Sequence, residues 1–351
     1  MDPVAISPWL WVSFVLGILF FLALDLGLFH RTARAIQFKE ALAWTAFWFA
    51  LAVLFAGALV HWRGGEEAMQ FTAGYVIELS LSLDNVLVMA LIFAWFRVPP
   101  ALQHRLLFLG ILGALIMRGA MIAAGVALIH EFAWVLYVFG AFLVFAGVKM
   151  VFGRGKMVQP ESNLALRLVR RWFPVTPDFD GPKFFSRLPG RSPEAFPQVD
   201  PNPASSAGSR GKCSGAAKAR LDGRLALTPL ALALVLIETT DLVFAVDSIP
   251  AVFSVTREAF IVFTSNVFAI LGLRSLYFVL AGALNYFRYL KTGLSAVLVF
   301  VGIKMLVEPH APPARWFQIQ IPTGISLLVV AVIFSLSIAL SVAAARCEKR
   351  K

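Results

Sequence analysis

The sequence has little charge and almost no cysteine. Only 15% of its 351 residues are Asp, Glu, Lys or Arg, whereas soluble domains carry about 25%. The two cysteines, Cys213 and Cys347, are too few for a disulfide framework, and neither belongs to a metal-ligand pattern. The chain also lacks a Ser/His/Asp set, an HExxH motif and a phosphate loop. These deficits argue against a disulfide-stabilised secreted protein, and we expect no enzyme.

Apolar residues take the place of the missing charge. They make up 59% of the chain, and the mean hydropathy of +0.79 over this length indicates many membrane spans. Each apolar stretch ends at a charged or Pro/Gly-rich break, and the nine stretches are about 8–29, 41–61, 69–96, 105–129, 132–152, 227–253, 259–283, 293–307 and 322–345. They are too long and too evenly apolar for barrel strands. The sequence therefore predicts an all-α polytopic membrane protein with about nine transmembrane helices.

The basic residues indicate how these helices are oriented. No basic residue precedes the first apolar run, which is long enough to span, so we expect no cleavable signal peptide. Of the 27 basic residues outside the stretches, 24 fall in one set of alternating loops or in the C-terminus, and three fall on the other side. Because cytoplasmic loops are enriched in Lys and Arg, we expect a bacterial inner-membrane protein with a periplasmic N-terminus and a cytoplasmic C-terminus. The net charge of +11 then reflects orientation, and no nucleic-acid partner is expected.

The charged breaks divide the chain into five parts. These are two N-terminal helices (1–68), a three-helix unit (69–152), a basic cytoplasmic loop (153–226), a second three-helix unit (227–307), and a final helix with a basic tail (308–351). Within the loop, the Pro/Gly/Ser-rich stretch 189–215 is predicted to be disordered. A solvated linker is the simplest interpretation of the loop, while contacts with anionic lipid or with protein partners stay open.

Three short motifs occur twice, in the same order along the chain. In the first motif, two carboxylates lie six residues apart and a small polar residue follows. The matched positions are Glu78 and Asp241, Asp84 and Asp247, Asn85 and Ser248, Arg118 and Arg274, and Lys149 and Lys304. Each unit holds three predicted helices, an odd number, so the second unit is predicted to be inverted relative to the first. Transporters built from inverted repeats bind their substrates near the midplane, where the repeats meet.

Nine charged residues lie well inside the predicted helices. A charge at the bilayer centre costs about 2.5–3.5 kcal/mol, so these side chains must face the bundle interior, a partner or water. The two acids of each motif are about 9 Å apart along a helix and about 120° apart around it. Either the helix opens locally, which Pro250 would allow in the second motif, or the two acids serve different sub-sites.

The chemistry of these residues favours a metal cation. Carboxylate, amide and hydroxyl oxygens surround the motifs, and no His or Cys lies near them. Such ligands suit Mg²⁺, Ca²⁺ and Mn²⁺. The candidate metal ligands are Glu78, Asp84, Glu238, Asp241 and Asp247, and the supporting residues are Asn85, Ser248, Asn266, Arg118, Arg274, Lys149, Lys304 and the interfacial Asp25. The alternative is that these acids and bases only pair with each other to hold the helices together.

The chain resembles the TerC family, the integral membrane proteins named for tellurium resistance. The matching stretches are 24–31, 78–85, 171–176, 237–250 and 263–277, and the resemblance covers nearly the whole chain. It implies an inner-membrane manganese exporter in which the five acids named above handle the metal, which is cargo and not a tightly bound cofactor. Proton exchange is the coupling we expect, because protons compete with metals for carboxylates. A tellurite-resistance factor or a membrane-assembly scaffold is the alternative, although the acidic motifs disfavour an oxyanion site. Stretch 189–215 is longer than the family pattern, which affects what the central loop contacts but not the membrane site.

Overall fold

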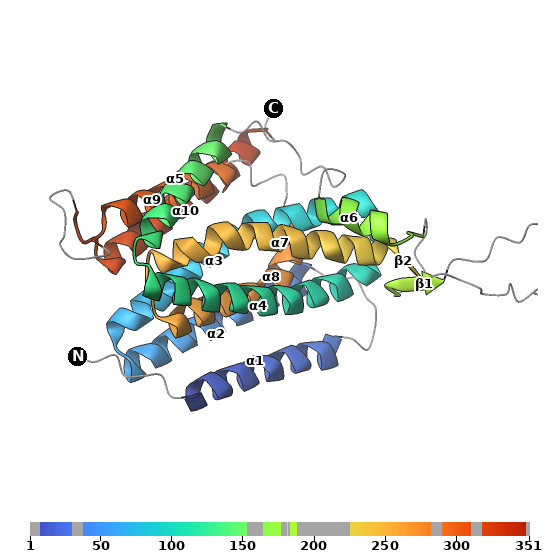
Figure 1. Cartoon of the computed structure of the whole chain (residues 1–351), viewed down its shortest axis with the longest axis horizontal. Coiled ribbons are helices and arrows are strands. Elements are labelled where there is room, and N and C mark those ends of the chain that lie inside the picture. The colour runs from blue at the N-terminus through green and yellow to red at the C-terminus, as the bar shows by residue number, and fades with distance from the viewer. Residues whose placement is uncertain are drawn as a thin grey trace, which may run out of the picture. The chain divides into compact units, whose positions relative to one another are not determined.

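The computed structural model describes residues 8–29, 38–152, 164–176, 181, 183–187, 225–281, 290–309 and 318–348. They form ten helices and one two-stranded sheet (Figure 1). The elements are α1 (Pro8–Phe29), α2 (Phe38–Trp62), α3 (Gly65–Phe96), α4 (Pro100–Glu131), α5 (Val135–Phe152), α6 (Leu164–Trp172), β1 (Phe185–Arg187), β2 (Leu225–Leu227), α7 (Pro229–Phe253), α8 (Ala259–Ala281), α9 (Leu290–Val307) and α10 (Thr323–Glu348). Two compact units result: a membrane unit of Met1–Pro160 with Ala233–Lys351, and a second unit of Glu161–Leu232.

The predicted apolar stretches coincide with helices. All nine correspond to α1–α5 and α7–α10, with ends that shift by a few residues. Within the described residues, seven of these helices are long and apolar enough to cross a bilayer: α2, α3, α4, α5, α7, α8 and α10. A polytopic helical membrane protein is therefore confirmed, while the count of nine spans stays a prediction. Helix α6 and the two three-residue strands were not predicted, and the stretch 189–215 lies outside the described residues.

Local sequence sets the ends of the helices near the repeated motifs. Helix α3 ends at Phe96 because Arg97 adopts a left-handed conformation with a φ of 52°, and its N–H bonds to carbonyls of the last turn. Helix α4 begins at Pro100, a position where proline is well tolerated. Helix α7 runs unbroken through Pro250 to Phe253. The local opening that Pro250 made conceivable is therefore absent from α7, so the two acids of its motif point in different directions around a regular helix.

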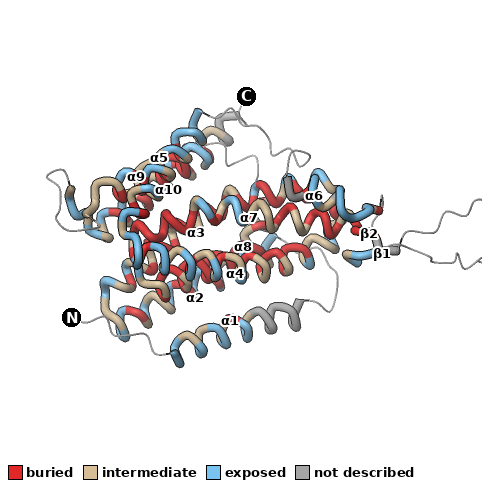
Figure 2. The backbone as a smooth tube through the Cα atoms, viewed as in Figure 1, coloured by how far each residue is buried: buried red, intermediate tan, exposed pale blue. Residues whose placement is uncertain are grey.

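Helix α8 is the centre of the membrane unit. It packs against α2, α3 and α4. In its apolar 18-residue stretch, 83% of the residues are buried, compared with 17% in the corresponding stretch of α2 and 22% in that of α10. Figure 2 shows the long buried runs of α3 and α8 beside the outward-facing residues of α2. Aromatic and branched side chains of α1 and α2, including Phe14 and Trp48, pack on α8 around Val267. The two inner helices thus carry many of the polar residues that cannot face lipid, including Glu78 and Asn266.

Helices α5, α9 and α10 form a second group within the membrane unit (Figure 1). Helices α5 and α9 run antiparallel and approach closely at glycines: a Cβ on Gly302 would meet the carbonyl oxygen of Gly140 at 2.7 Å. Farther along, Ser295 Oγ donates to the carbonyl oxygen of Gly147 at 3.0 Å. Small residues that allow backbones to approach are the usual means of helix association in membranes. This group meets the rest of the unit through contacts of α9 and α10 with α3 and a smaller contact of α5 with α4.

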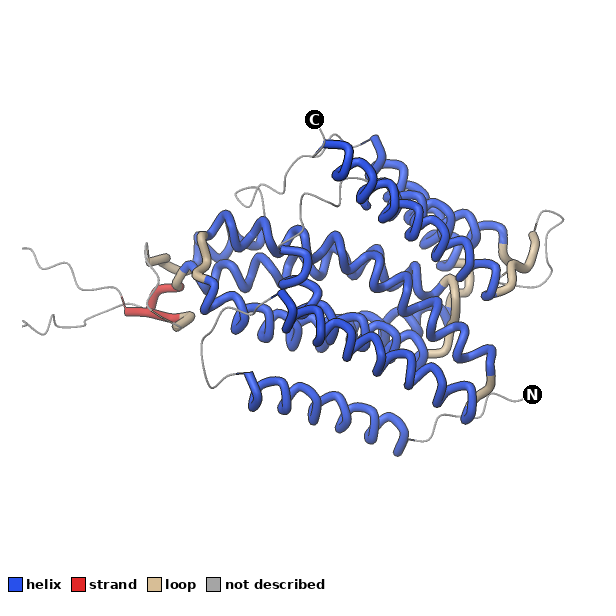
Figure 3. Tube along the Cα trace, turned by 180° about the vertical axis from the view of Figure 1, so that it is seen from behind, coloured by secondary structure: helices blue, strands red, loops and turns tan. Residues whose placement is uncertain are grey.

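The second unit holds the only sheet among the described residues, drawn as the two short red segments of Figure 3. Strands β1 and β2 are antiparallel, with Ser186 opposite Ala226. Val175 adds an isolated parallel bridge to Leu227. The Thr228 hydroxyl donates to the carbonyl oxygen of Lys183 at 2.8 Å. Strand β2 therefore ends beside β1, and only Thr228 separates it from the first residue of α7.

The α5–α9 contact generates a stability prediction. In Gly302→Ala, the new methyl group would lie within 2.8 Å of the Val144 backbone nitrogen as well as close to the Gly140 carbonyl. Backbone atoms cannot move aside as a flexible side chain can, so the helices must separate, at a cost of about 1–3 kcal/mol. We expect a lower thermal unfolding temperature in detergent. Gly57→Ala is the control, because nothing lies within 4 Å of its Cβ position, and equal melting of both variants would contradict this packing.

Candidate functional site

A buried ion triad lies at the centre of the membrane unit. The guanidinium of Arg118 (α4) donates to Glu78 Oε2 (α3) at 2.9 Å. It also forms a two-pronged contact with Asp241 (α7), with Nε–Oδ2 and Nη2–Oδ1 distances of 3.2 and 3.1 Å. All three side chains are buried, with 3% or less exposed. A bidentate arginine–carboxylate contact is both strong and directional, so Arg118 fixes α3, α4 and α7 relative to one another.

Amide and hydroxyl groups complete the triad. Asn85 Nδ2 donates to Asp241 Oδ1 at 2.6 Å, and Asn266 Nδ2 of α8 donates to Glu78 Oε1. Arg118 Nη1 also donates to Ser248 Oγ at 3.2 Å. Every carboxylate of the triad therefore receives at least two hydrogen bonds, as a buried charge requires.

Helical periodicity explains which residues reach the triad. Glu78 and Asn85 are seven residues apart, as are Asp241 and Ser248, and this spacing returns to the same face after two turns. The second acid of each motif, Asp84 or Asp247, falls on a neighbouring face and is only half-buried. The two acids of each motif thus occupy different surroundings. This is the second of the two alternatives that the sequence left open.

Two amide oxygens beside the triad have no hydrogen-bond donor. Asn85 and Asn266 give their N–H groups to carboxylates, and the Oδ1 atom of each is buried without a partner. Ser82 Oγ, one turn before Asn85, is also unpartnered. An unsatisfied buried oxygen costs about 1–3 kcal/mol. These oxygens are therefore available to a cation or a water molecule.

A third acid, Glu238, lies close to the triad. Its carboxylate rests against the bare backbone of Gly113 in α4, where an added Cβ would meet Glu238 Oε1. It lies within electrostatic range of Asp241. Glu238 is only half-buried, in contrast to the triad. It therefore extends the acidic cluster from the buried triad toward a more accessible region of α7.

The remaining two acids have lysines as electrostatic neighbours. Asp84 lies within range of Lys291 at the start of α9, and Asp247 within range of Lys149 near the end of α5. The acids are on α3 and α7, and the lysines are on α9 and α5, so each interaction crosses between the two helix groups of the membrane unit. The structure does not bring Asp84 and Asp247 into the triad.

The other predicted residues have different surroundings. Arg274 is buried in α8, and Lys149 faces outward on α5, with its Nζ atom 5.8 Å from the centre of the Phe145 ring. Asp25 belongs to α1, but its side chain lies outside the described residues. Across the described ranges, no three His, Cys, Asp or Glu side chains gather as a preformed metal site. The acids nearest one another are instead held by Arg118.

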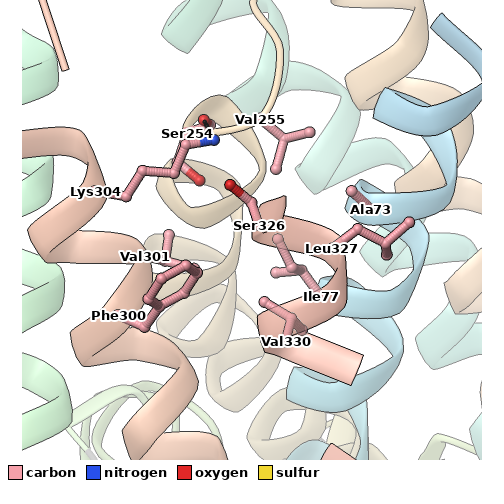
Figure 4. A pocket seen from close by; sticks show the side chains of 10 residues that line it. All are labelled: Ala73, Ile77, Ser254, Val255, Phe300, Val301, Lys304, Ser326, Leu327 and Val330. Atoms are coloured by element: carbon pink, nitrogen blue, oxygen red, sulfur yellow. Dashed lines mark hydrogen bonds between the residues drawn. The ribbon is translucent and has the colours of Figure 1, made fainter. Parts of the chain in front are cut away.

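Lys304 lies at a separate polar site, shown in Figure 4. Its Nζ atom donates to the carbonyl oxygen of Ser254, just beyond α7, at 3.0 Å, and lies 3.6 Å from Glu308 Oε1. A cavity of about 10 Å³ beside it is lined by Ser326, Ile77 and Val330 among others, and such a volume accommodates about one water molecule. Lys304 therefore joins α9 to the end of α7 and takes no part in the triad.

Sequence reasoning missed two contributors to this region. Gly113 carries no chemistry of its own, and only its distance to Glu238 shows its importance. Lys291 was counted with a loop, whereas α9 begins one residue before it. A glycine within a helix and a lysine at a helix start are weak sequence patterns. The roles of both residues depend on which helices, distant in sequence, pack beside them.

Comparison with known proteins gives one family. Residues 63–348 match the integral membrane protein TerC family. An uncharacterized membrane protein of Myxococcus xanthus is 46% identical over 341 residues, covering 97% of this chain and 94% of its own. A Salmonella typhi protein, whose name describes it as a candidate membrane-bound redox modulator, Alx, is 39% identical, covering 95% and 94%. No solved structure matches the chain.

The triad generates a prediction about abundance. Arg118→Met leaves Glu78 and Asp241 buried without their cation, and breaking a buried pair in this way costs about 3–5 kcal/mol. We expect a large loss of folded protein in the membrane, measured by quantitative immunoblot and by melting in detergent. Lys149→Met is the matched control, since it removes an exposed cation from a predicted span and leaves the triad intact; its electrostatic neighbour, Asp247, is only half-buried. The double variant Arg118→Met with Asp241→Asn should lose less stability than the sum of the losses in the two single variants. An Arg118→Met protein as abundant and as stable as Lys149→Met would refute the triad.

Proposed function

We propose that this chain, which belongs to the TerC family of integral membrane proteins, exports a divalent metal ion, Mn²⁺, across the bacterial inner membrane. One observation carries the proposal: two buried carboxylates hold a single guanidinium inside the membrane unit, a third carboxylate lies within electrostatic range of one of them, and the two amides bonded to the pair each keep an unpartnered oxygen. Intramembrane ionisable residues usually mark ion pathways. The proposed orientation has a periplasmic N-terminus and a cytoplasmic C-terminus.

The charge of the cluster suits a divalent cation. Glu78, Asp241 and Glu238 contribute three negative charges when ionised, and Arg118 contributes one positive charge. The remainder of minus two matches one divalent ion, while Asp84 and Asp247 each have a lysine nearby. A bound metal would lower the electrostatic cost of holding these acids away from water. An oxyanion such as tellurite would instead raise that cost.

The type of ligand supports a hard cation. All candidate ligands are oxygens, from carboxylates, the Asn85 and Asn266 amides and hydroxyl groups. Mn²⁺, Mg²⁺ and Ca²⁺ prefer such ligands, whereas thiolate and imidazole select softer metals. The relatives named for redox modulation leave open a different role. We favour transport because the polar residues of this chain converge inside the membrane unit.

Arg118 has a defined part in the proposed mechanism. Its guanidinium now occupies the space between Glu78 and Asp241 and neutralises one charge. A metal that binds these acids must displace it, so Arg118 acts as a built-in counter-ion of the metal-free state. When the ion leaves, Arg118 returns to the carboxylates, which prevents a bare acidic cluster from trapping the metal.

The inverted repeat is part of the proposal. Glu78 and Asp241, which are matched positions, meet on either side of Arg118, and the matched Asn85 and Ser248 also contact the triad. The matched helices α5 and α9 pack antiparallel through glycines. Both features are what two inverted units related by a pseudo-two-fold axis would produce.

Transport in reconstituted vesicles tests the proposal. Vesicles holding the purified protein would be assayed with Mn²⁺, Ca²⁺, Mg²⁺ and Zn²⁺, with and without an imposed pH gradient at fixed membrane potential. We expect Mn²⁺ flux that responds to the gradient, because protons compete with metals for carboxylates. Protein-free vesicles give the leak. Flux of none of the four metals above the leak would reject transport and favour the tellurite-resistance or scaffold alternatives, while gradient-independent Mn²⁺ flux would reject only proton coupling.

The motif aspartates give the sharpest mutational prediction. We propose that Asp84 and Asp247, half-buried on the same helices as Glu78 and Asp241, line the path by which the ion reaches or leaves the triad, so Asp84→Asn and Asp247→Asn should each abolish metal efflux. Both should leave protein abundance near normal, since neither side chain belongs to the triad that joins the helices. Asp25→Asn is the milder control, as that residue is predicted to lie at the interface. Efflux and immunoblot abundance are measured together, and native efflux by both variants would exclude these two acids from the path.

A further inference from the structure

Helix α6 carries two adjacent stripes of different chemistry. Arg167 and Arg171 are four residues apart and both are exposed. Leu168 and Trp172, also four apart, leave 61% and 74% of their surfaces exposed. Residues at this spacing are neighbours on a helix surface, so a cationic stripe lies directly beside an apolar one. Leu166, on the far side of the helix, is buried.

The apolar exposure continues beyond α6. Phe173 follows Trp172 and is 49% exposed, and Phe185 in β1 is 58% exposed. Large apolar side chains rarely cluster on a water-exposed surface without a partner. Over residues 161–232, the sequence of this second unit has eleven basic residues and six acidic ones. Its occupant should therefore be anionic and should offer an apolar layer.

We propose that α6 lies on the cytoplasmic leaflet of the membrane, with Arg167 and Arg171 at anionic lipid headgroups and Leu168 and Trp172 at the acyl boundary. Short helices with basic and apolar faces and a terminal Trp are suited to this interface. The second unit is joined to two candidate membrane spans along the chain, since residues 153–163 connect α5 to α6 and Thr228 alone connects β2 to α7. In a linker surrounded by water, an exposed Trp beside two arginines would leave a large apolar surface without a partner.

This inference is independent of metal export. It concerns the side chains of α6 in the second unit, whereas the proposed transport residues lie on α3, α4, α7 and α8. It also differs from the general lipid contact of the spanning helices, because it depends on the charge of the lipid. Raised ionic strength should weaken it by screening the arginine–headgroup attraction.

A depth probe on full-length protein tests the proposal. After Cys213→Ser and Cys347→Ser, Leu168→Cys would carry an environment-sensitive fluorophore. The protein would be reconstituted in phosphatidylcholine vesicles with or without phosphatidylglycerol, each containing lipids brominated on the acyl chains as quenchers. We expect strong quenching in the anionic vesicles, weaker quenching in the neutral ones, and a loss of the difference at high salt.

Charge variants separate lipid binding from general packing. Arg167→Gln with Arg171→Gln should weaken the partition of α6 into the membrane roughly five-fold per arginine. Each basic residue near an anionic surface strengthens that partition by about this factor. Arg167→Lys with Arg171→Lys preserves the charge and should restore the quenching. Equal quenching in neutral and anionic vesicles would overturn the proposal. So would a fluorophore that is shielded from water but not quenched by bromolipid, because that result would place α6 against protein.

Discussion

The membrane unit depends on one interaction, the contact of Arg118 with Glu78 and Asp241. It joins three helices and neutralises one of two charges that the bilayer could not tolerate unpaired. The surrounding hydrogen bonds all involve these three residues: Asn85 and Asn266 donate to the two carboxylates, and Arg118 donates to Ser248. In the proposed mechanism this site is held together by its own counter-ion, and a metal would bind only where the arginine moves away from the carboxylates. Structural pairing and transport are therefore compatible roles for the same residues.

Much of this arrangement could be predicted from the sequence. Long apolar stretches located the helices, and charges inside those stretches marked Glu78, Arg118 and Asp241, because few residues are excluded from lipid so strongly. The repeat pointed to Asn85 and Ser248 as a pair. The sequence could not tell which acid would face Arg118, since that depends on how α3, α4 and α7 are rotated in the unit. It left open whether α7 would break at Pro250, and the helix is continuous.

Short elements and close contacts were beyond sequence reasoning. Helix α6 spans nine residues and the strands three each, so their patterns are too brief to stand out from a polar loop. The proximity of Gly113 to Glu238 and of Gly140 to Gly302 follows from how helices distant in sequence cross. In both cases the contact is possible because the glycine has no side chain. Periodicity can locate a buried face, but not the helix that will cover it.

The positions of the triad residues along the chain also bear on how the protein is made. Glu78 and Arg118 are 40 residues apart on consecutive helices, so they can neutralise each other while the rest of the chain is still on the ribosome. Asp241 follows Arg118 by 123 residues. Helix α7 thus leaves the insertion machinery with a carboxylate whose partner is already in the membrane. Pairing with Arg118 lowers the cost of placing that carboxylate in the bilayer, so the order of synthesis matches the order in which the charges can be accommodated.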